Sequence, residues 1–209
     1  MNGQFVISLD FEKYWGVFDS IAAKGNYTNN LNNVDTVIDR LLELSKRYNI
    51  KLTFSTVGFL FNKSKAEFIK NTPHVLPNYS VKTHNPYPLI KDVSSIEDTN
   101  NKHYGYHSLL KIAKEDQHEI GTHTYSHYYC LEEGQTIEQF EADLKMAKKV
   151  AHNLNIDLQS IVFPRNQINS NYIQVCYDNG IISYRGIENH AIYKPNAKKE
   201  TTKPLQRAF

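Results

Sequence analysis

The chain has 209 residues, which is enough for one sizeable hydrophobic core and favours a single domain or at most two. Hydrophobic residues make up 40% and charged residues 22%, the proportions of an ordinary globular protein. Because 24 basic residues face 22 acidic ones, charge gives no argument for a nucleic-acid partner, and a neutral, polar substrate fits this surface at least as well.

The first residues and the cysteines bear on the compartment. No stretch approaches the ~18 apolar residues of a membrane span, and Met1 leads into an apolar run with no basic segment before it. The sequence therefore predicts a cytoplasmic protein without a membrane span, although a chain whose signal peptide has been removed would look the same. Cys130 and Cys176 lack metal-ligand spacing and are expected to be free thiols. The oligomeric state is left open.

The N-terminal third predicts a strand, a helix and a second strand. Gln4–Leu9 is a short apolar run with β-branched members, followed by acidic residues, as in a buried strand that ends in polar chemistry. Val34–Tyr48 has a helical apolar stripe with Asn33 as the expected N-cap, and Lys51–Val57 is the next strand. This spacing is typical of a βαβ unit, so the two strands should be parallel neighbours.

Residues 62–117 show no sustained period and predict an elaborated loop with short helices over Ser64–Lys70 and Tyr106–Glu115. Long irregular loops in compact domains are often functional, so this segment is expected to shape the choice of substrate. Three tyrosines in it are candidate stacking groups for a sugar: Tyr87, Tyr104 and Tyr106.

The second half again alternates strands and helices. The predicted strands are His118–Thr122, Gln159–Phe163 and Ile181–Tyr184, and the predicted helices are Thr136–Asn153 and Ser170–Asn179. The first helix opens with a capping box of Thr136 and Gln139. Alternation along the whole chain predicts an α/β fold with a parallel sheet or barrel, in one domain over residues 1–209.

Three polar segments fall at or just after the ends of predicted strands, where parallel α/β barrels place their active groups. In the first, Asp10 and Glu12 are two residues apart on a strand and therefore point the same way. Two carboxylates on one face repel each other, and burying them requires a cation or a proton.

The second segment is His123-Thr-Tyr-Ser-His127. Histidines four apart on a helical turn face the same side and can share one metal ion. His118-Glu119 begins like the HExxH motif of zinc proteases, but Thr122 occupies the position of the second histidine, which excludes that mechanism.

The third segment is FPRNQ, residues 163–167. Arg165 entering a site that holds carboxylates can pair with one of them, Asp10, and keep it ionised and oriented. Together, one carboxylate and two histidines make a set of three ligands with open positions, the arrangement of catalytic zinc. Such a set also suits Co²⁺, Ni²⁺ or Fe²⁺.

The order SLDFE, HEIGTHTYSH and FPRNQ resembles the polysaccharide deacetylase family, carbohydrate esterase family four, over roughly Gln4 to Gly186. The resemblance implies an irregular parallel (β/α) barrel that removes N- or O-acetyl groups from sugars. It implies Asp10 as the catalytic base, Glu12, His123 and His127 as ligands of a divalent ion, and Thr122 as the family's small hydroxyl residue beside the first histidine. We expect this ion to be Zn²⁺, with Co²⁺, Ni²⁺ and Fe²⁺ as alternatives.

The chain departs from the family's usual pattern at three points. Phe11 separates acids that are usually adjacent, so the chain is similar to a branch with D-x-E spacing. Arg165 follows Pro164 instead of preceding it. His190 is the single histidine downstream of the motifs, and its surroundings do not match the family's general acid. Either the chain is cut short before the barrel closes, at its C-terminal end, or another group donates the proton.

The prediction is therefore a metal-dependent hydrolase that removes acetyl groups, N-acetyl first, from a sugar or polysaccharide. Asn166, Gln167, Arg185 and Tyr125 are predicted to contact the substrate, although Arg185 suits a structural ion pair equally well. A hydrolase of non-sugar amides on the same fold and a non-catalytic carbohydrate-binding protein remain as alternatives.

Overall fold

The computed structural model describes residues 5–20, 27–97 and 102–187. The strands are β1 (Ser8–Phe11), β2 (Thr53–Thr56), β3 (Glu119–Thr122), β4 (Ser160–Ile161) and β5 (Ser183–Tyr184). The α-helices are α1 (Tyr27–Asn32), α2 (Val34–Tyr48), α3 (Lys65–Lys70), α4 (Tyr106–Ala113), α5 (Ile137–His152) and α6 (Ile173–Asp178). Short 3-10 helices lie between them: η1 (Lys13–Gly16), η3 (Gly58–Phe61), η4 (Lys82–His84), η5 (Tyr87–Asp92), η6 (Pro164–Asn166) and η7 (Ser170–Tyr172).

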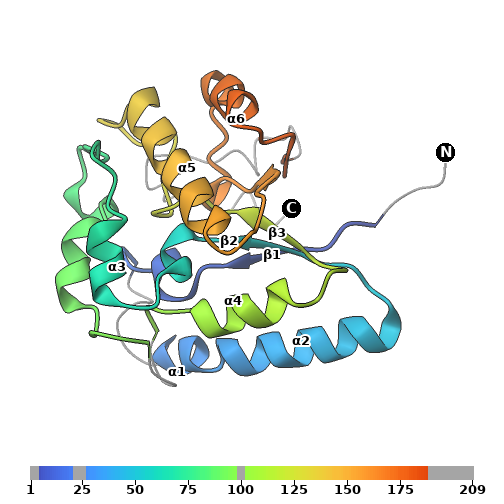
Figure 1. Cartoon of the computed structure of the whole chain (residues 1–209). Helices are drawn as coiled ribbons and strands as arrows, with labels where there is room; N and C mark the ends of the chain where they lie inside the picture. Colours follow the sequence, from blue (N-terminus) through green and yellow to red (C-terminus); the bar gives the residue numbers. More distant parts are fainter. Residues whose placement is uncertain (1–4, 21–26, 98–101, 188–209) are drawn as a thin grey trace, which may run out of the picture.

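The five strands form one parallel sheet in the order β1-β2-β3-β4-β5. Helices α2 and α4 lie together on one side of the strands, and α5 and α6 lie on another (Figure 1). The α/β fold with parallel strands is thus confirmed. Because all the strands run the same way, their carboxyl ends meet at one edge, which is where the polar segments lie.

The sheet curves strongly. Strands β1 and β5 stand at opposite ends of the strand order, and a flat sheet with about 4.8 Å between neighbours would set them about 19 Å apart. Yet Arg185, directly after β5, places Nη1 2.9 Å from Asp10 Oδ1 and 3.2 Å from Ser8 Oγ on β1. The strands therefore bend toward each other at their carboxyl ends, as in a barrel wall.

The main core packs the sheet against its helices and 3-10 turns. Phe54 of β2, Phe59 of η3 and Phe140 of α5 are all at most 1% exposed and belong to one apolar cluster. Trp15 is fully buried in the same cluster, and its indole N–H donates to the His103 carbonyl at 2.8 Å. This fixes the chain just after β1, where the acidic residues lie. None of the described helices is both long enough and apolar enough to span a bilayer.

Most predicted elements are present, with shifted ends. The bounds of α2 are those predicted. Asn33 has helical backbone angles and makes no side-chain capping hydrogen bond, so the predicted N-cap was wrong. Asn49, in the left-handed region, ends the helix. The Thr136–Gln139 capping box of α5 is confirmed. The first strand runs later than predicted, so that Asp10 lies within β1. Both cysteines are free and buried, as predicted.

Candidate metal centre and active site

Strand β1 delivers two carboxylates to the carboxyl edge of the sheet. Phe11, between them, is 3% exposed and anchors the strand in the core, whereas Asp10 is exposed. Glu12 follows the strand, and its side chain folds back over Gly16, where an added Cβ would overlap the Glu12 carboxyl group. A glycine at this position is therefore what leaves room for the carboxylate.

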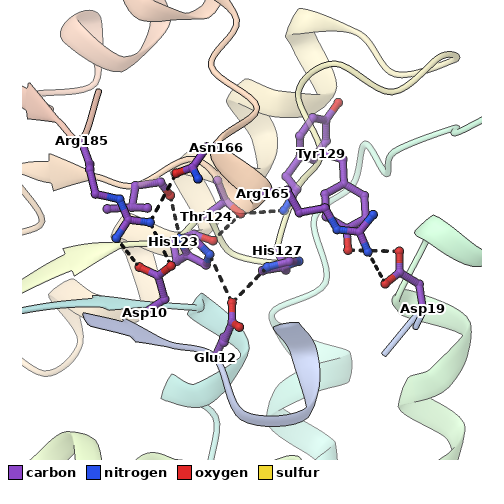
Figure 2. Close-up of polar contacts among 12 residues, drawn as sticks. Asp10, Glu12, Asp19, His123, Thr124, His127, Tyr129, Arg165, Asn166 and Arg185 are labelled. Atoms are coloured by element: carbon purple, nitrogen blue, oxygen red, sulfur yellow. Dashed lines mark hydrogen bonds and ion pairs between the residues drawn. The ribbon is translucent and has the colours of Figure 1, made fainter. Parts of the chain in front are cut away.

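Glu12 faces the two histidines of the second segment (Figure 2). Its Oε2 lies 3.3 Å from His123 Nε2 and 3.2 Å from His127 Nε2, and one ligand atom from each residue lies within 4.8 Å of the others. Both imidazoles are at most 2% exposed, whereas the Glu12 side chain is 29% exposed. The two histidines thus lie on the buried side of the site, and solvent reaches the site from the Glu12 side.

The hydrogen bonds fix which atoms are available. His123 Nδ1 lies 2.8 Å from the Val162 carbonyl oxygen, an acceptor only, so Nδ1 carries the hydrogen and the lone pair of the neutral ring lies on Nε2. His127 Nδ1 has no hydrogen-bond partner within the described part of the chain. Two imidazole nitrogens and a carboxylate oxygen at these separations require a proton or a cation between them, so the donor set fits a divalent ion.

The electrostatics agree with this arrangement. Burial by itself would raise the pKa of Glu12, but its close contacts with the His123 and His127 rings outweigh this effect and hold that pKa below its ordinary value. Burial lowers the pKa of His127 despite the adjacent Glu12 carboxylate. An ionised carboxylate beside a buried imidazole that favours its neutral form is the protonation pattern that metal binding requires.

The histidine segment is not the helical turn that its spacing predicted. It is a loop after β3 in which Thr124 and His127 have positive φ angles of 62° and 58°. The Thr124 hydroxyl donates to the His123 carbonyl at 2.6 Å and accepts from the Tyr128 N–H at 2.7 Å. A tight loop, and not an i, i+4 helical face, therefore brings the two imidazoles together.

Arg185, not Arg165, holds Asp10. Its Nη1 and Nη2 each donate to a different Asp10 oxygen at 2.9 Å, and Nη2 lies 3.4 Å from the Asn166 side-chain oxygen (Figure 2). This two-pronged contact orients the carboxylate beside the candidate metal centre. Asn166 therefore lies beside the arginine that holds Asp10, and its contact with a substrate stays a prediction.

The expected pairing of Arg165 with Asp10 is wrong. Arg165 and Asn166 have positive φ angles of 54° and 53°, so the backbone turns sharply after Pro164. The Arg165 guanidinium then lies on the His127 side, 2.6 Å from Asp19 Oδ1 and stacked 4.4 Å from the Tyr129 ring centre. The Asp19 carboxylate is 2% exposed, so Arg165 neutralises a buried charge.

Two predicted substrate contacts lie in the interior instead. Tyr125 is fully buried, and its hydroxyl accepts from Asn62 at 3.2 Å. Gln167 is 2% exposed, donating to Glu132 at 2.8 Å and accepting from the Leu131 N–H at 3.0 Å. Both side chains support the loops around the site and do not face a substrate.

The candidate stacking tyrosines are mostly buried as well. Tyr87 is 8% exposed and Tyr104 0%, because both pack into the main core, so neither presents a ring to a sugar; Tyr106 is partly exposed beside Lys63. His190 lies outside the described residues. The sequence reasoning missed Gly16 and Asp19, for which spacing gave no signal, and gave Arg185 no definite partner although it follows a strand as the other site residues do.

Comparison with known proteins places the chain in a family. A family model described as polysaccharide deacetylase matches residues 17–183, a span that contains His123, His127 and Arg165. The chain belongs to the polysaccharide deacetylase family. The matched span begins after Asp10 and Glu12, so the family assignment does not depend on them. Curated protein sequences give no match.

One solved structure shares the fold of this chain. A provisionally assigned polysaccharide deacetylase from Mycobacterium smegmatis superposes with a TM-score of 0.54 at 13% identity, covering 86% of this chain and 49% of that one. The fold is therefore the predicted one. Also similar are a carbohydrate esterase family 4 pseudoenzyme from Bacillus anthracis (TM-score 0.48, 12% identity, 86% and 42% coverage) and a peptidoglycan N-acetylglucosamine deacetylase (0.44, 14%, 86% and 54%). The chain spans 42 to 54% of the length of these three structures.

Proposed function

We propose that the chain is a metal-dependent deacetylase that hydrolyses acetyl groups, most readily N-acetyl groups, on a carbohydrate. The observation that carries this proposal is the convergence of Glu12 Oε2 and two histidine Nε2 atoms beside an arginine-held Asp10, in a member of the polysaccharide deacetylase family. Glu12, His123 and His127 would hold the ion, and Zn²⁺ suits one oxygen and two nitrogen donors with an open position.

A divalent ion at these atoms would supply Lewis-acid chemistry, polarising the acetyl carbonyl and lowering the pKa of water from ~15.7 towards ~7. Asp10 is the described group suited to take the proton of the attacking water, because it is exposed at the open side of the site. Arg185 keeps Asp10 oriented by binding both of its oxygens. Water adds to the acetyl carbon, the C–N bond breaks, and acetate and the amine leave.

Metal content and acetate release test the proposal together. The purified chain should contain about one equivalent of ion, lose it with a chelator, and recover it with Zn²⁺. Glu12→Ala and His127→Ala should lose the ion, whereas Asp10→Asn should keep the ion and lose turnover on N-acetylated sugar oligomers. Glu43→Ala, on the exposed face of α2, is the control that should change neither. Retention of stoichiometric metal in both ligand variants would remove the basis of the proposal.

The same assay separates the alternatives. Release of ammonia or an amine from non-sugar amides, without acetate from sugars, would assign the site to amide hydrolysis. Sugar binding that survives chelation, with no hydrolysis of either class of substrate, would instead identify a carbohydrate-binding protein.

A further inference from the structure

The loop between the two histidines is held in a conformation that it would not adopt alone. Thr124 and His127 both have positive φ angles, a region that costs non-glycine residues of order 1–3 kcal/mol each. Such backbone persists only where its surroundings over-determine it. The positions of the two imidazoles therefore depend on what holds the three residues between them, Thr124, Tyr125 and Ser126.

A single buried carboxylate on α5 holds the N–H groups of this loop. Asp143 Oδ1 accepts from the Tyr125 N–H at 2.6 Å, and Oδ2 accepts from the Ser126 N–H at 3.1 Å and also from the Ser126 hydroxyl. Asp143 is 1% exposed, and it makes no ion pair with any described residue. Its hydrogen bonds to the described chain all go to Tyr125 and Ser126.

The carbonyl groups of the same loop are held from the opposite side by η3. The Gly58 N–H donates to the Thr124 carbonyl at 2.8 Å, and the Phe59 N–H donates to the Tyr125 carbonyl at 2.9 Å. A Cβ on Gly58 would lie 2.7 Å from Tyr125 Cα, so the approach requires glycine. The loop is thus held by hydrogen bonds from both sides. Asp143 of α5 accepts from its N–H groups, and the backbone of η3 donates to its carbonyl groups.

Keeping a carboxylate at this position is costly. Burial raises the pKa of Asp143 to about 7, even though three donors stabilise its ionised form. An apolar side chain would avoid the cost but would leave two buried N–H groups without acceptors.

We infer that Asp143 is a positioning residue for the metal centre: it fixes the loop so that His123 and His127 present their Nε2 atoms to one ion. This rests on the proposed function, because it assigns a role to Asp143 in the same site. It assigns no contact of Asp143 with substrate or ion. Groups that orient metal ligands in this way typically change metal affinity by about 10–100-fold when they are removed.

Zinc affinity, measured by competition with a chelating dye at pH 8, tests this inference. Asp143→Asn keeps the size of the side chain but replaces one carboxylate oxygen with an NH₂ group, which cannot accept the hydrogen bonds from Ser126. The variant should bind zinc about 10–100-fold more weakly. Ser126→Ala, which removes one of the donors, should weaken binding several-fold. Val150→Ala is the matched control on α5: it opens the core at a residue 4% exposed and should leave zinc affinity unchanged.

Hydrogen exchange in the metal-free protein separates failure of this inference from failure of the proposed function. The Tyr125 and Ser126 amides should be protected in the wild type and in Val150→Ala, and should lose protection selectively in Asp143→Asn. Wild-type zinc affinity in Asp143→Asn would overturn the positioning role and leave the metal site standing. A wild-type chain that binds no zinc would overturn the proposed function, whether or not the amides were protected.

Discussion

Arg165 and Arg185 both follow strand ends, but they bind different carboxylates. Arg185 binds both oxygens of Asp10 at the open side of the site, whereas Arg165 neutralises the buried Asp19 on the His127 side. Their sequence contexts, a strand end followed by polar residues, do not distinguish them. The distinction comes from the positive φ of Arg165, which turns its side chain away from Asp10.

The roles of the two arginines can be separated by substitution. Arg185→Lys keeps the charge but loses the two-pronged contact, so turnover should fall by about 100-fold with zinc affinity little changed. Arg165→Lys should keep most turnover and lower the free energy of unfolding, because the buried Asp19 loses its closest partner. Acetate release, zinc titration and urea unfolding on both variants measure these effects. A larger loss of turnover in Arg165→Lys than in Arg185→Lys would assign the orienting role to Arg165.

Gly16 sets the position of the Glu12 carboxylate. In Gly16→Ala the added methyl group occupies the space of that carboxylate, which must move, whereas no left-handed φ forbids alanine there. We expect zinc affinity to fall by at least about tenfold, by analogy with other groups that orient ligands, and the free energy of unfolding to change little. Dye competition and urea unfolding measure the two quantities. Unchanged affinity would show that Glu12 has a second usable position.

Spacing predicted the convergence of Asp10, Glu12, His123 and His127, because side chains at i and i+2 share a strand face and strand ends share an edge. It could not predict which of two arginines would reach Asp10, or that Tyr125 would be buried. Those outcomes depend on backbone turns after β3 and β4 and on packing between segments distant in sequence. Local pattern carries no information on either.

At the scale of elements, the start of α5 is set by its local sequence. The capping box predicted from Thr136 and Gln139 is present, and the helix that it starts carries Asp143. The expected N-cap at Asn33 is not used, because α1 precedes it almost without interruption and leaves Asn33 in helical geometry. The histidine loop also departs from its local pattern, since contacts with α5 and η3 override the helical spacing.

Removing the α5 cap should destabilise the fold modestly. Thr136→Ala loses the hydrogen bond from the Gln139 N–H, and such substitutions cost about 1 kcal/mol. Urea unfolding of the metal-free chain should show this loss with an unchanged dependence on denaturant. Glu138→Ala, two positions after Thr136 in the first turn, is a control for the charge near the helix start. Equal stability of Thr136→Ala and the wild type would mean that the cap hydrogen bond contributes nothing to the fold.

At the scale of the molecule, Asp143 should make stability depend on pH. Its folded pKa of about 7 lies above the ordinary 3.8, so the folded chain binds this proton more tightly than the unfolded chain. The stability it contributes is therefore fully present below about pH 4 and lost as the pH rises through about 7. Relative to Asp143→Asn, the free energy of unfolding of the metal-free wild type should fall by about 1.4 kcal/mol per pH unit across this window. A difference between the two proteins that stays flat from pH 4 to 7 would contradict the raised pKa.

The alternation of apolar runs predicted the parallel sheet and the pairing of β1 with β2, but neither the order of the later strands nor the choice between an open sheet and a barrel. The curvature of the sheet appears in the contact that joins β5 to β1. That contact has a consequence for synthesis on the ribosome. Glu12, His123 and His127 have all been made by residue 127, whereas the partner of Asp10 is made 175 residues after Asp10 itself. A nascent chain therefore contains all three proposed metal ligands before it contains the arginine that orients the proposed base, so the proposed hydrolysis would require the last described strand.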